Sequence, residues 1–189
     1  MKKIINEIAS IQTGIYAQTS ANGQFYYIQA RHFDQDRKFI KTVKPELLPD
    51  DRMEKHILQS GDVLVASKGY DRFAVTYKDM PQPAVASSMF IVLHITDLKL
   101  VLPEYLTWFI NHPKTQKILS GNSKGTALPS ITKNDVGKLD ILIPTIKKQK
   151  AVLIVYQLFQ KERQLKFKLD ALSKSKIQQQ IFNAISENR

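Results

Sequence analysis

Few residues in this sequence have types and spacings that could carry out chemistry, and the first to consider is a serine between two glycines. Gly121-Asn-Ser-Lys-Gly125 matches the G-x-S-x-G turn that presents the nucleophile in many hydrolases. That chemistry needs a histidine to take the serine proton, and in hydrolases with this turn the histidine follows the serine. All four histidines lie upstream of Ser123. The motif therefore indicates a glycine loop whose backbone can approach another surface closely.

Metal-dependent and cofactor-dependent chemistry has little support in the sequence. The histidines lack the spacing of zinc ligands, and there is no cysteine. Asp62 and Lys68 on one predicted strand keep a metal-dependent nuclease open as an alternative, although no second acid stands at the usual short distance from the lysine. No glycine-rich nucleotide-binding motif is present. We therefore expect a non-catalytic chain with no cofactor and no metal ion.

Three predicted loops instead carry side chains of the kinds that read DNA. Arg and Lys can pair with guanine edges, Gln and Asn with adenine, and Ser or Thr with either base or with phosphate. The predicted DNA-binding residues are Gln29, Arg31 and His32 after a strand, Lys68, Tyr70 and Arg72 around Gly69, and Asn122, Ser123, Lys124 and Thr126 around Gly125. Lysines are expected mainly to hold phosphates, whereas planar amides and guanidinium groups discriminate bases. The strongest candidates are Arg31, Lys68, Arg72 and Lys124.

Apolar patterning and turn residues predict the elements that position these loops. Residues 2–9 fit a short helix that a loop around Gly14 closes. β-branched and aromatic residues predict strands at 25–30, 38–43, 62–67, 73–77 and 85–94. Pro103 opens a predicted helix, Pro113 ends it and starts a second short helix, and residues 139–144 form an apolar strand. The expected fold is α/β (α+β), with a curved, mostly antiparallel sheet and short helices.

The last part of the chain predicts one long helix from Ile146 onward. At 1.5 Å per residue, about forty residues span ~60 Å. Apolar residues recur there at alternating spacings of three and four, with Glu162 in one position, which is typical of a coiled coil. The predicted dimerisation seam consists of Val155, Leu158, Leu165, Leu169 and Leu172. Beyond Leu172 the apolar phase slips to Ile177, Ile181 and Ile185, so the heptad pattern does not persist.

Composition favours a polyanionic partner. The 189 residues carry a net charge of +11 at pH 7, and residues 146–189 hold ten Lys or Arg against three acids. Such a surplus indicates nucleic acid or an anionic membrane surface. The longest apolar run, Ala151 to Tyr156, is far shorter than the roughly 18 to 20 residues that cross a bilayer. We therefore expect a soluble cytoplasmic protein with no membrane association.

Short motifs follow one another along nearly the whole chain. Upstream are Glu7-Ile-Ala-Ser-Ile-Gln-Thr-Gly14, Tyr27-Ile-Gln-Ala-Arg-His32, Leu58-Gln-Ser-Gly-Asp-Val-Leu-Val65, Ala86-Ser-Ser88 and Pro103-Glu-Tyr-Leu106, and downstream are the glycine loop, the strand Leu139 to Pro144 and the long helix. Their order resembles that of the DNA-specificity subunit of type I restriction-modification systems. One departure is that the family usually has Pro-x-x-Glu-Gln after the strand, whereas here Pro144 is followed by Lys147-Lys-Gln149.

The resemblance implies a target recognition domain over residues 1–144 and a dimerisation and spacer helix over residues 145–189. A complete subunit of that family holds two recognition domains apart with two such helices and reads a split target. This chain has one of each, so a homodimer, or pairing with another specificity half through an antiparallel coiled coil, would complete the pattern. The implied partners are double-stranded DNA and the methyltransferase and restriction subunits. A stand-alone DNA-binding regulator, and less strongly the nuclease, remain alternatives.

Overall fold

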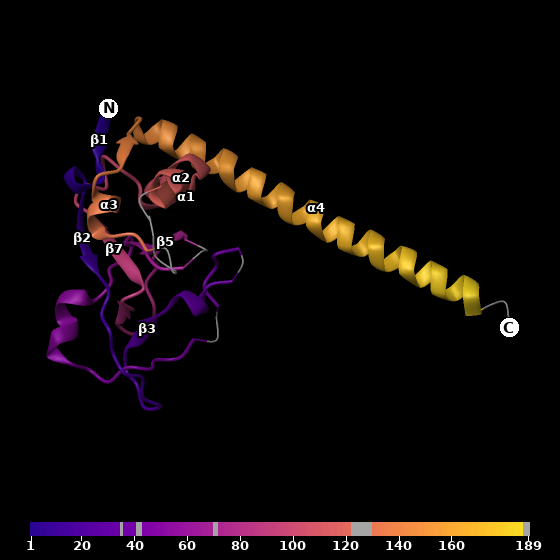
Figure 1. Ribbon diagram of the computed structural model, residues 1–189, viewed down its shortest axis with the longest axis horizontal. Helices are drawn as coiled ribbons and strands as arrows, with labels where there is room; N and C mark the ends of the chain where they lie inside the picture. The colour runs from indigo at the N-terminus through magenta and orange to yellow at the C-terminus, as the bar shows by residue number, and fades with distance from the viewer. Residues whose placement is uncertain (35, 41–42, 70–71, 122–129, 187–189) are drawn as a thin grey trace. The chain divides into compact units, whose positions relative to one another are not determined.

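The computed structural model describes residues 1–34, 36–40, 43–69, 72–121 and 130–186. The chain divides into two units, Met1–Gln149 and Lys150–Arg189. The first unit contains antiparallel sheets and short helices, and the second continues one long helix (Figure 1). The predicted fold class is therefore confirmed.

A four-stranded antiparallel sheet lies at the centre of the first unit. Its strands, in the order β2-β7-β4-β5, are Ala9–Thr13, Phe90–Ile95, Val63–Ala66 and Ala74–Thr76. Every residue of β4 is buried, because both faces of this central strand are covered. On one face Leu64 and Val92 pack in an aromatic and aliphatic core, and on the other side helix α1 (Pro103–Asn111) contacts β4 and β5. The sheet thus forms a rigid support for the connections between its strands.

Two smaller sheets complete the first unit. β1 (Lys2–Ile4) pairs antiparallel with β8 (Asp140–Leu142), and β3 (Tyr26–Ile28) pairs parallel with β6 (Ala84–Ala86). The parallel pair is the exception in an otherwise antiparallel set of described strands. Consequently the mostly antiparallel character expected from the sequence is confirmed.

Short helices connect and cover these strands. They are η1 (Ile5–Glu7), η2 (Ala30–His32), η3 (Asp51–His56), α1, α2 (Pro113–Gly121) and α3 (Lys133–Gly137). Pro103 occupies the first turn of α1, where its missing N–H costs nothing. At the other end of α1, the Asn111 side chain accepts a hydrogen bond from Ala74 N (2.9 Å) and donates one to Ala74 O (2.8 Å). This pair of bonds fixes the start of β5 against α1.

Some expected elements differ from the structure. Residues 2–9 form β1, η1 and the start of β2 instead of a helix, because Lys2–Ile4 pairs with a strand from the far end of the unit. The strand expected at 85–94 divides into β6 and β7, which pair with different partners. Residues 38–40 form no strand, although Phe39 makes an isolated bridge to Phe33. In each case tertiary pairing overrides the local pattern.

The long helix α4 spans Ile146–Ser186, as the sequence predicts. Its first turn belongs to the first unit, where the Gln149 side chain is fully buried. Gln149 accepts a hydrogen bond from Leu102 N (2.9 Å) and donates to the carbonyl groups of Leu100 (2.8 Å) and Pro144 (2.9 Å). The beginning of α4 is therefore locked to the residues that precede α1 and to the end of the β8 segment.

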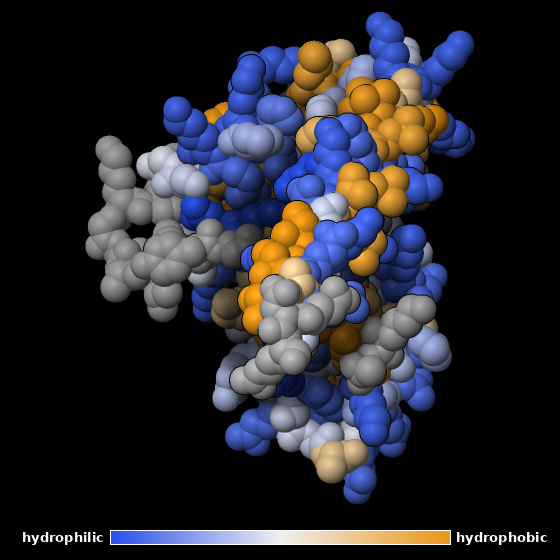
Figure 2. Space-filling model, turned by 90° about the vertical axis from the view of Figure 1, so that its right-hand side faces the viewer, coloured by the Kyte–Doolittle hydropathy of each residue, from blue (hydrophilic) through white to orange (hydrophobic). Residues whose placement is uncertain are grey.

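The rest of α4 carries large apolar side chains on its surface. The predicted seam residues are between 58% and 69% exposed. Figure 2 shows hydrophobic residues in orange among hydrophilic ones on one face of the molecule. No helix within the described residues is both long and apolar enough to cross a membrane.

Candidate nucleic-acid interface

Strand pairing brings the first two predicted DNA-binding loops to the same end of the first unit. β4 ends at Ala66, which pairs with Phe90 at the start of β7. β6, which precedes β7, ends at Ala86, and Ala86 pairs with Ile28 at the end of β3. The segment that follows β3 and the connection from β4 to β5 therefore leave the sheets at a common end, which we call the loop end.

The two segments that flank the third predicted loop also lie at the loop end. Lys68 makes an antiparallel bridge to Ser130, and Ser67 O accepts a hydrogen bond from Ile131 N at 2.9 Å. The Arg72 guanidinium group donates to the Ser120 hydroxyl group at the end of α2. Both flanks thus lie against the β4–β5 connection. Tyr70, Asn122, Ser123, Lys124 and Thr126 lie outside the described residues.

An aromatic cluster joins the first loop to the second. The Phe33 ring lies 5.6 Å from the Phe73 ring, 5.5 Å from Phe39 and 6.0 Å from Phe90, each in an edge-to-face arrangement. Such pairs add stabilisation beyond the area that they bury. Because Phe33 follows His32 and Phe73 follows Arg72 in the chain, the cluster fixes the two loops relative to each other.

Arg31 is an exposed cation with a fixed orientation. Its Nη2 donates to Glu46 Oε2 at 3.1 Å, and its Nε lies 3.3 Å from His32 Nε2. The Arg31 side chain is 62% exposed, against 26% for that of Glu46. A guanidinium group held on one edge keeps its other donors for a planar acceptor pair such as the guanine edge. The geometry suits base reading better than a freely rotating lysine would.

His32 is placed differently from its predicted neighbours. Its ring is only 7% exposed and packs edge-on against Phe39. Gln29 N lies 3.3 Å from His32 Nδ1, and a neutral imidazole can accept from either Gln29 N or Arg31 Nε, since only one of its ring nitrogens is an acceptor. Burial lowers the pKa of His32, the charge of Glu46 opposes this shift, and the charge of Arg31 adds to it. A direct contact between the buried His32 and DNA stays a prediction.

Two further cations at the loop end escaped the sequence interpretation. Arg37 has φ of 62°, and its guanidinium group lies 6.0 Å from the centre of the Phe73 ring. Positive φ is costly for a residue with a side chain and often marks a functional loop. Lys38 follows, and its N–H donates to Asp34 Oδ1 at 2.8 Å. The sequence held one signal for these two cations, the short polar run between Phe33 and Phe39. Such a run is typical of a hairpin.

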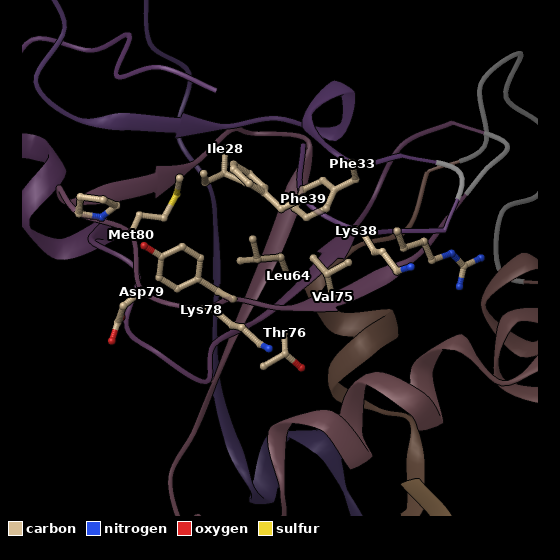
Figure 3. A pocket seen from close by; sticks show the side chains of 13 residues that line it. Ile28, Phe33, Lys38, Phe39, Leu64, Val75, Thr76, Lys78, Asp79 and Met80 are labelled. Atoms are coloured by element: carbon tan, nitrogen blue, oxygen red, sulfur yellow. The ribbon is translucent and has the colours of Figure 1, made fainter. Parts of the chain in front are cut away.

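A pocket of about 510 Å³ lies beside this hairpin. Figure 3 shows Phe33, Phe39, Leu64 and Val75 lining it together with Lys38 and Lys78. Its wall is mainly apolar, so it offers little to a hydrated metal ion. In the part of the chain that the structure describes, no group of three or more His, Asp or Glu side chains could hold a metal ion.

Three solved structures with the same architecture come from type I restriction-modification systems. The S subunit from M. genitalium is 12% identical with a TM-score of 0.57, covering 85% of this chain and 39% of that one. The HsdS subunit from Thermoanaerobacter tengcongensis is 20% identical with a TM-score of 0.63. A chain from a structure on complex assembly and conformational transition of the type I R-M system is 20% identical with a TM-score of 0.67.

The chain has the S-subunit fold. It spans only part of its relatives, since 88% of this chain corresponds to 43% of the HsdS subunit. No protein-family model matches the sequence, and no curated protein sequence matches it significantly. The similarity to S subunits is therefore detected in the three-dimensional structure. It agrees with the motif order in the sequence.

The structure gives a physical role to Gln149, which sequence reasoning did not identify. Counted from Pro144, Lys147 and Lys148 stand where Pro-x-x-Glu-Gln has its glutamate and glutamine, and both are exposed. Gln149 is the next residue, and its three hydrogen bonds hold the start of α4. The connection at this point therefore depends on Gln149.

The residues proposed for a nuclease do not come together. Asp62 precedes β4 and Lys68 follows it, so about six residues of extended chain, or ~20 Å, separate them. Asp62 is 3% exposed, and its carboxylate contacts His94 Nδ1 at 2.8 Å and accepts from Gln59 N at 2.9 Å. A buried carboxylate with these partners stabilises the turn before β4, and the geometry gives the nuclease no support.

Proposed function

We propose that the chain recognises specific DNA as a half-length specificity subunit of a type I restriction-modification system. The observation that carries this proposal is the S-subunit fold over 85% to 88% of this chain and about two fifths of the matched chains. A subunit built from two such halves would need two copies of this chain or one copy with another half. In this proposal residues 1–144 act as the target recognition domain, and residues 145–189 as the dimerisation and spacer helix.

The loop end would contact the DNA. Lys68 and the other lysines would hold phosphates and provide salt-dependent affinity, while Arg31 and Arg72 would read base edges. Arg31 is the better reader of the two described residues because its ion pair with Glu46 already limits its orientations, which lowers the entropy lost on binding. Gln29, at the start of the same segment, would supply an amide for adenine.

The exposed seam of α4 supports the second part of the proposal. Val155, Leu158, Leu165, Leu169 and Leu172 form an apolar stripe at heptad spacing, with Glu162 as its polar interruption. A stripe of this length is stable in water when another helix covers it. In a homodimer the two helices would run antiparallel about a two-fold axis, and the target would be two inverted half-sites with a gap. Methyltransferase and restriction subunits would supply the chemistry.

Selection of bound sequences from a random duplex library tests this function. We expect the wild-type protein to enrich a gapped, two-fold symmetric target. Arg31→Ala should weaken binding to that target by about 1 to 3 kcal/mol and relax the preference at one position of each half-site. Equal loss on random DNA would demote Arg31 to a phosphate contact, and enrichment of no sequence at all would refute the proposal.

Arg52 offers a matched control for this experiment. It is also an arginine paired with an acid, Asp50, but it lies in η3, outside the three loops. Arg52→Ala removes the same charge and should leave the preferred sequence unchanged. The remaining alternative, a stand-alone regulator, predicts the same enriched target without a methyltransferase chain in the purified native complex, so co-purification separates the two functions.

A further inference from the structure

We infer that Tyr16 is a DNA-binding residue whose hydroxyl group contacts a phosphate of the duplex. Its side chain is 83% exposed, more than any other large apolar or aromatic side chain in the part of the chain that the structure describes. The inference rests on the proposed function, and it adds a contact outside the three predicted loops. This contact would set the position of the loop end on the duplex without reading a base.

The backbone on both sides of Tyr16 is fixed by the globular unit. The Tyr27 hydroxyl group donates to Ile15 O at 2.9 Å and accepts from Ala17 N at 3.3 Å. The side chains of Ile15 and Ala17 pack against a buried cluster that includes Tyr27. Tyr16, between these two anchored neighbours, keeps its ring in solvent. Because a tyrosine side chain has only two rotatable angles, ordering it against a ligand costs little conformational entropy.

Tyr16 lies at the loop end, beside the turn between β6 and β7. β2, which precedes Tyr16, runs antiparallel to β7 and therefore ends where β7 begins. Ile15 N donates to Ala86 O at 2.9 Å, and Ile15 O accepts from Ser88 N at 2.8 Å. The segment that carries Tyr16 is thus attached directly to this turn.

The same turn also contacts the first two predicted DNA-binding loops. Ser87 N donates to Ile28 O at 2.9 Å, just before the first loop, and Met89 O accepts from the Ser67 hydroxyl group at 2.8 Å, just before Lys68. The Tyr16 segment and the end of β3 bond to opposite edges of the turn, so at about 4.8 Å per strand they lie roughly 10 Å apart. This separation corresponds to about three base pairs along a duplex.

The charge distribution around Tyr16 suits a phosphate. Residues 8–33 and 80–96, which contain the Tyr16 segment and the turn, include no Asp or Glu. Glu46, an acid that meets this segment through a backbone hydrogen bond, has its carboxylate paired with Arg31 at 3.1 Å. A tyrosine hydroxyl group is one of the neutral donors that contact DNA phosphates. Because it is neutral, it displaces no counterion, and the contact should add affinity without adding salt dependence.

Removal of the one hydroxyl group tests the inference. In fluorescence anisotropy titrations of the full chain, Tyr16→Phe should weaken binding about three- to tenfold for each half-site, the range of a neutral hydrogen bond. The loss should be equal on the enriched target and on random duplexes. The dependence of binding on salt should stay that of the wild type, whereas Lys68→Ala should lower its slope by about one per copy.

Leu98→Ala is the matched control for a second variant, Tyr16→Ala. Leu98 is 56% exposed and follows β7 at the opposite end of the same sheet. We expect Tyr16→Ala to weaken binding at least as much as Tyr16→Phe, and Leu98→Ala to bind like the wild type. Equal losses in Tyr16→Ala and Leu98→Ala would show that truncation of any exposed side chain weakens binding, and would overturn the inference. Thermal unfolding of each variant checks that the globular unit is intact.

Duplexes that carry a single neutral methylphosphonate identify the phosphate. At one position of each half-site, about three base pairs from the base pair whose preference Arg31→Ala relaxes, the substitution should weaken binding of the wild type. Tyr16→Phe should lose no further affinity at that position, because the hydrogen bond is already absent. Losses that add at every position scanned would overturn the contact.

Failure of this inference is distinguishable from failure of the proposed function. If the wild type binds its enriched target and both Tyr16 variants bind it equally well, the inference is overturned and the proposed function stands. A changed preferred sequence in Tyr16→Phe would indicate a base contact and would overturn the assignment to a phosphate. If the wild type enriches no sequence and binds no duplex, the proposed function fails, and the inference fails with it.

Discussion

The seam of α4 makes a quantitative prediction for the substitution Leu165→Asp. Leu165 is 58% exposed in the single chain, which leaves roughly 100 Å² for a partner helix to cover. At ~25 cal/mol per Å² this burial contributes about 2.5 kcal/mol per copy, or about 5 kcal/mol per dimer. Loss of that contribution raises the dimer dissociation constant about 10³- to 10⁴-fold.

Aspartate at position 165 also weakens the dimer through electrostatic repulsion. An antiparallel pair centred between Arg163 and Gln164 aligns all six seam positions and sets residue 165 opposite Glu162 of the other copy. In that register the substitution places two carboxylates opposite each other near the centre of the seam. Like charges at such a site oppose pairing, and a carboxylate loses hydration on burial. The estimated increase in the dissociation constant is therefore a lower limit.

Light scattering across a concentration series provides the assay, and Phe167→Asp provides the control. Phe167 is 77% exposed on the same helix but falls at the heptad position farthest from the seam. We expect Leu165→Asp to be monomeric where the wild type and Phe167→Asp are dimeric. Binding to a two-half-site duplex should weaken with the dimer, because avidity is lost, while each domain still folds.

Two outcomes would refute this reasoning. An unchanged dimer in Leu165→Asp would show that α4 pairs through other residues, or that the copies meet through their globular units. Equal dissociation of Leu165→Asp and Phe167→Asp would show that negative charge anywhere on the helix disrupts the dimer, without a defined seam. Circular dichroism of both variants checks that the helix itself persists.

Three other perturbations have definite expected results. Gln149→Leu should lower the free energy of unfolding by about 2 to 5 kcal/mol in urea titrations, because three buried backbone groups lose their partner. The pKa of His32 is lower in the folded than in the unfolded protein, so the unfolded state binds the proton first. Stability should therefore fall as pH drops below about 6.5, and His32→Gln should reduce that slope in urea titrations at several pH values. Glu162→Leu should tighten the dimer in sedimentation equilibrium by removing a charge from the seam, and an unchanged dissociation constant would place Glu162 outside it.

Much of the fold could be predicted because its signals are local. α4 is readable from apolar periodicity without any knowledge of its surroundings, and Pro103 and Pro113 mark the starts of α1 and α2. The apolar runs that became β4 and β7 are buried on a central sheet. In such segments the sequence pattern and the tertiary environment favour the same structure.

The arrangement at the N-terminus could not be predicted in this way. Lys2–Ile4 forms a strand only because β8, far away in sequence, offers an edge to pair with. The same holds for the division of residues 85–94, where Ala86 and Phe90 belong to strands with different partners. Long-range pairing of this kind leaves no periodic signal in a single sequence.

The candidate interface shows the same division between local and long-range information. Residue types alone identified Arg31, Lys68 and Arg72 as groups suited to DNA. Glu46, which orients Arg31, lies fifteen residues further along the chain, and Ser120, which accepts from Arg72, lies forty-eight residues further. These partners follow from the meeting of strands at the loop end, so neither was visible in the sequence. Burial of His32 is a consequence of the same packing.

The polar groups inside the globular unit differ in their surroundings from the exposed groups at the loop end and along α4. Polar groups inside the globular unit, such as Gln149 and the Asp62–His94 pair, have partners from the same unit, so their role is structural. At the loop end, by contrast, exposed cations gather on a chain whose net charge is +11. Along α4, leucines of the seam remain in contact with water. In the proposed function, a polyanion would neutralise the loop end and a second helix would cover the seam. Because these two surfaces need different chemistry, we expect DNA binding and dimerisation to be separable by mutation.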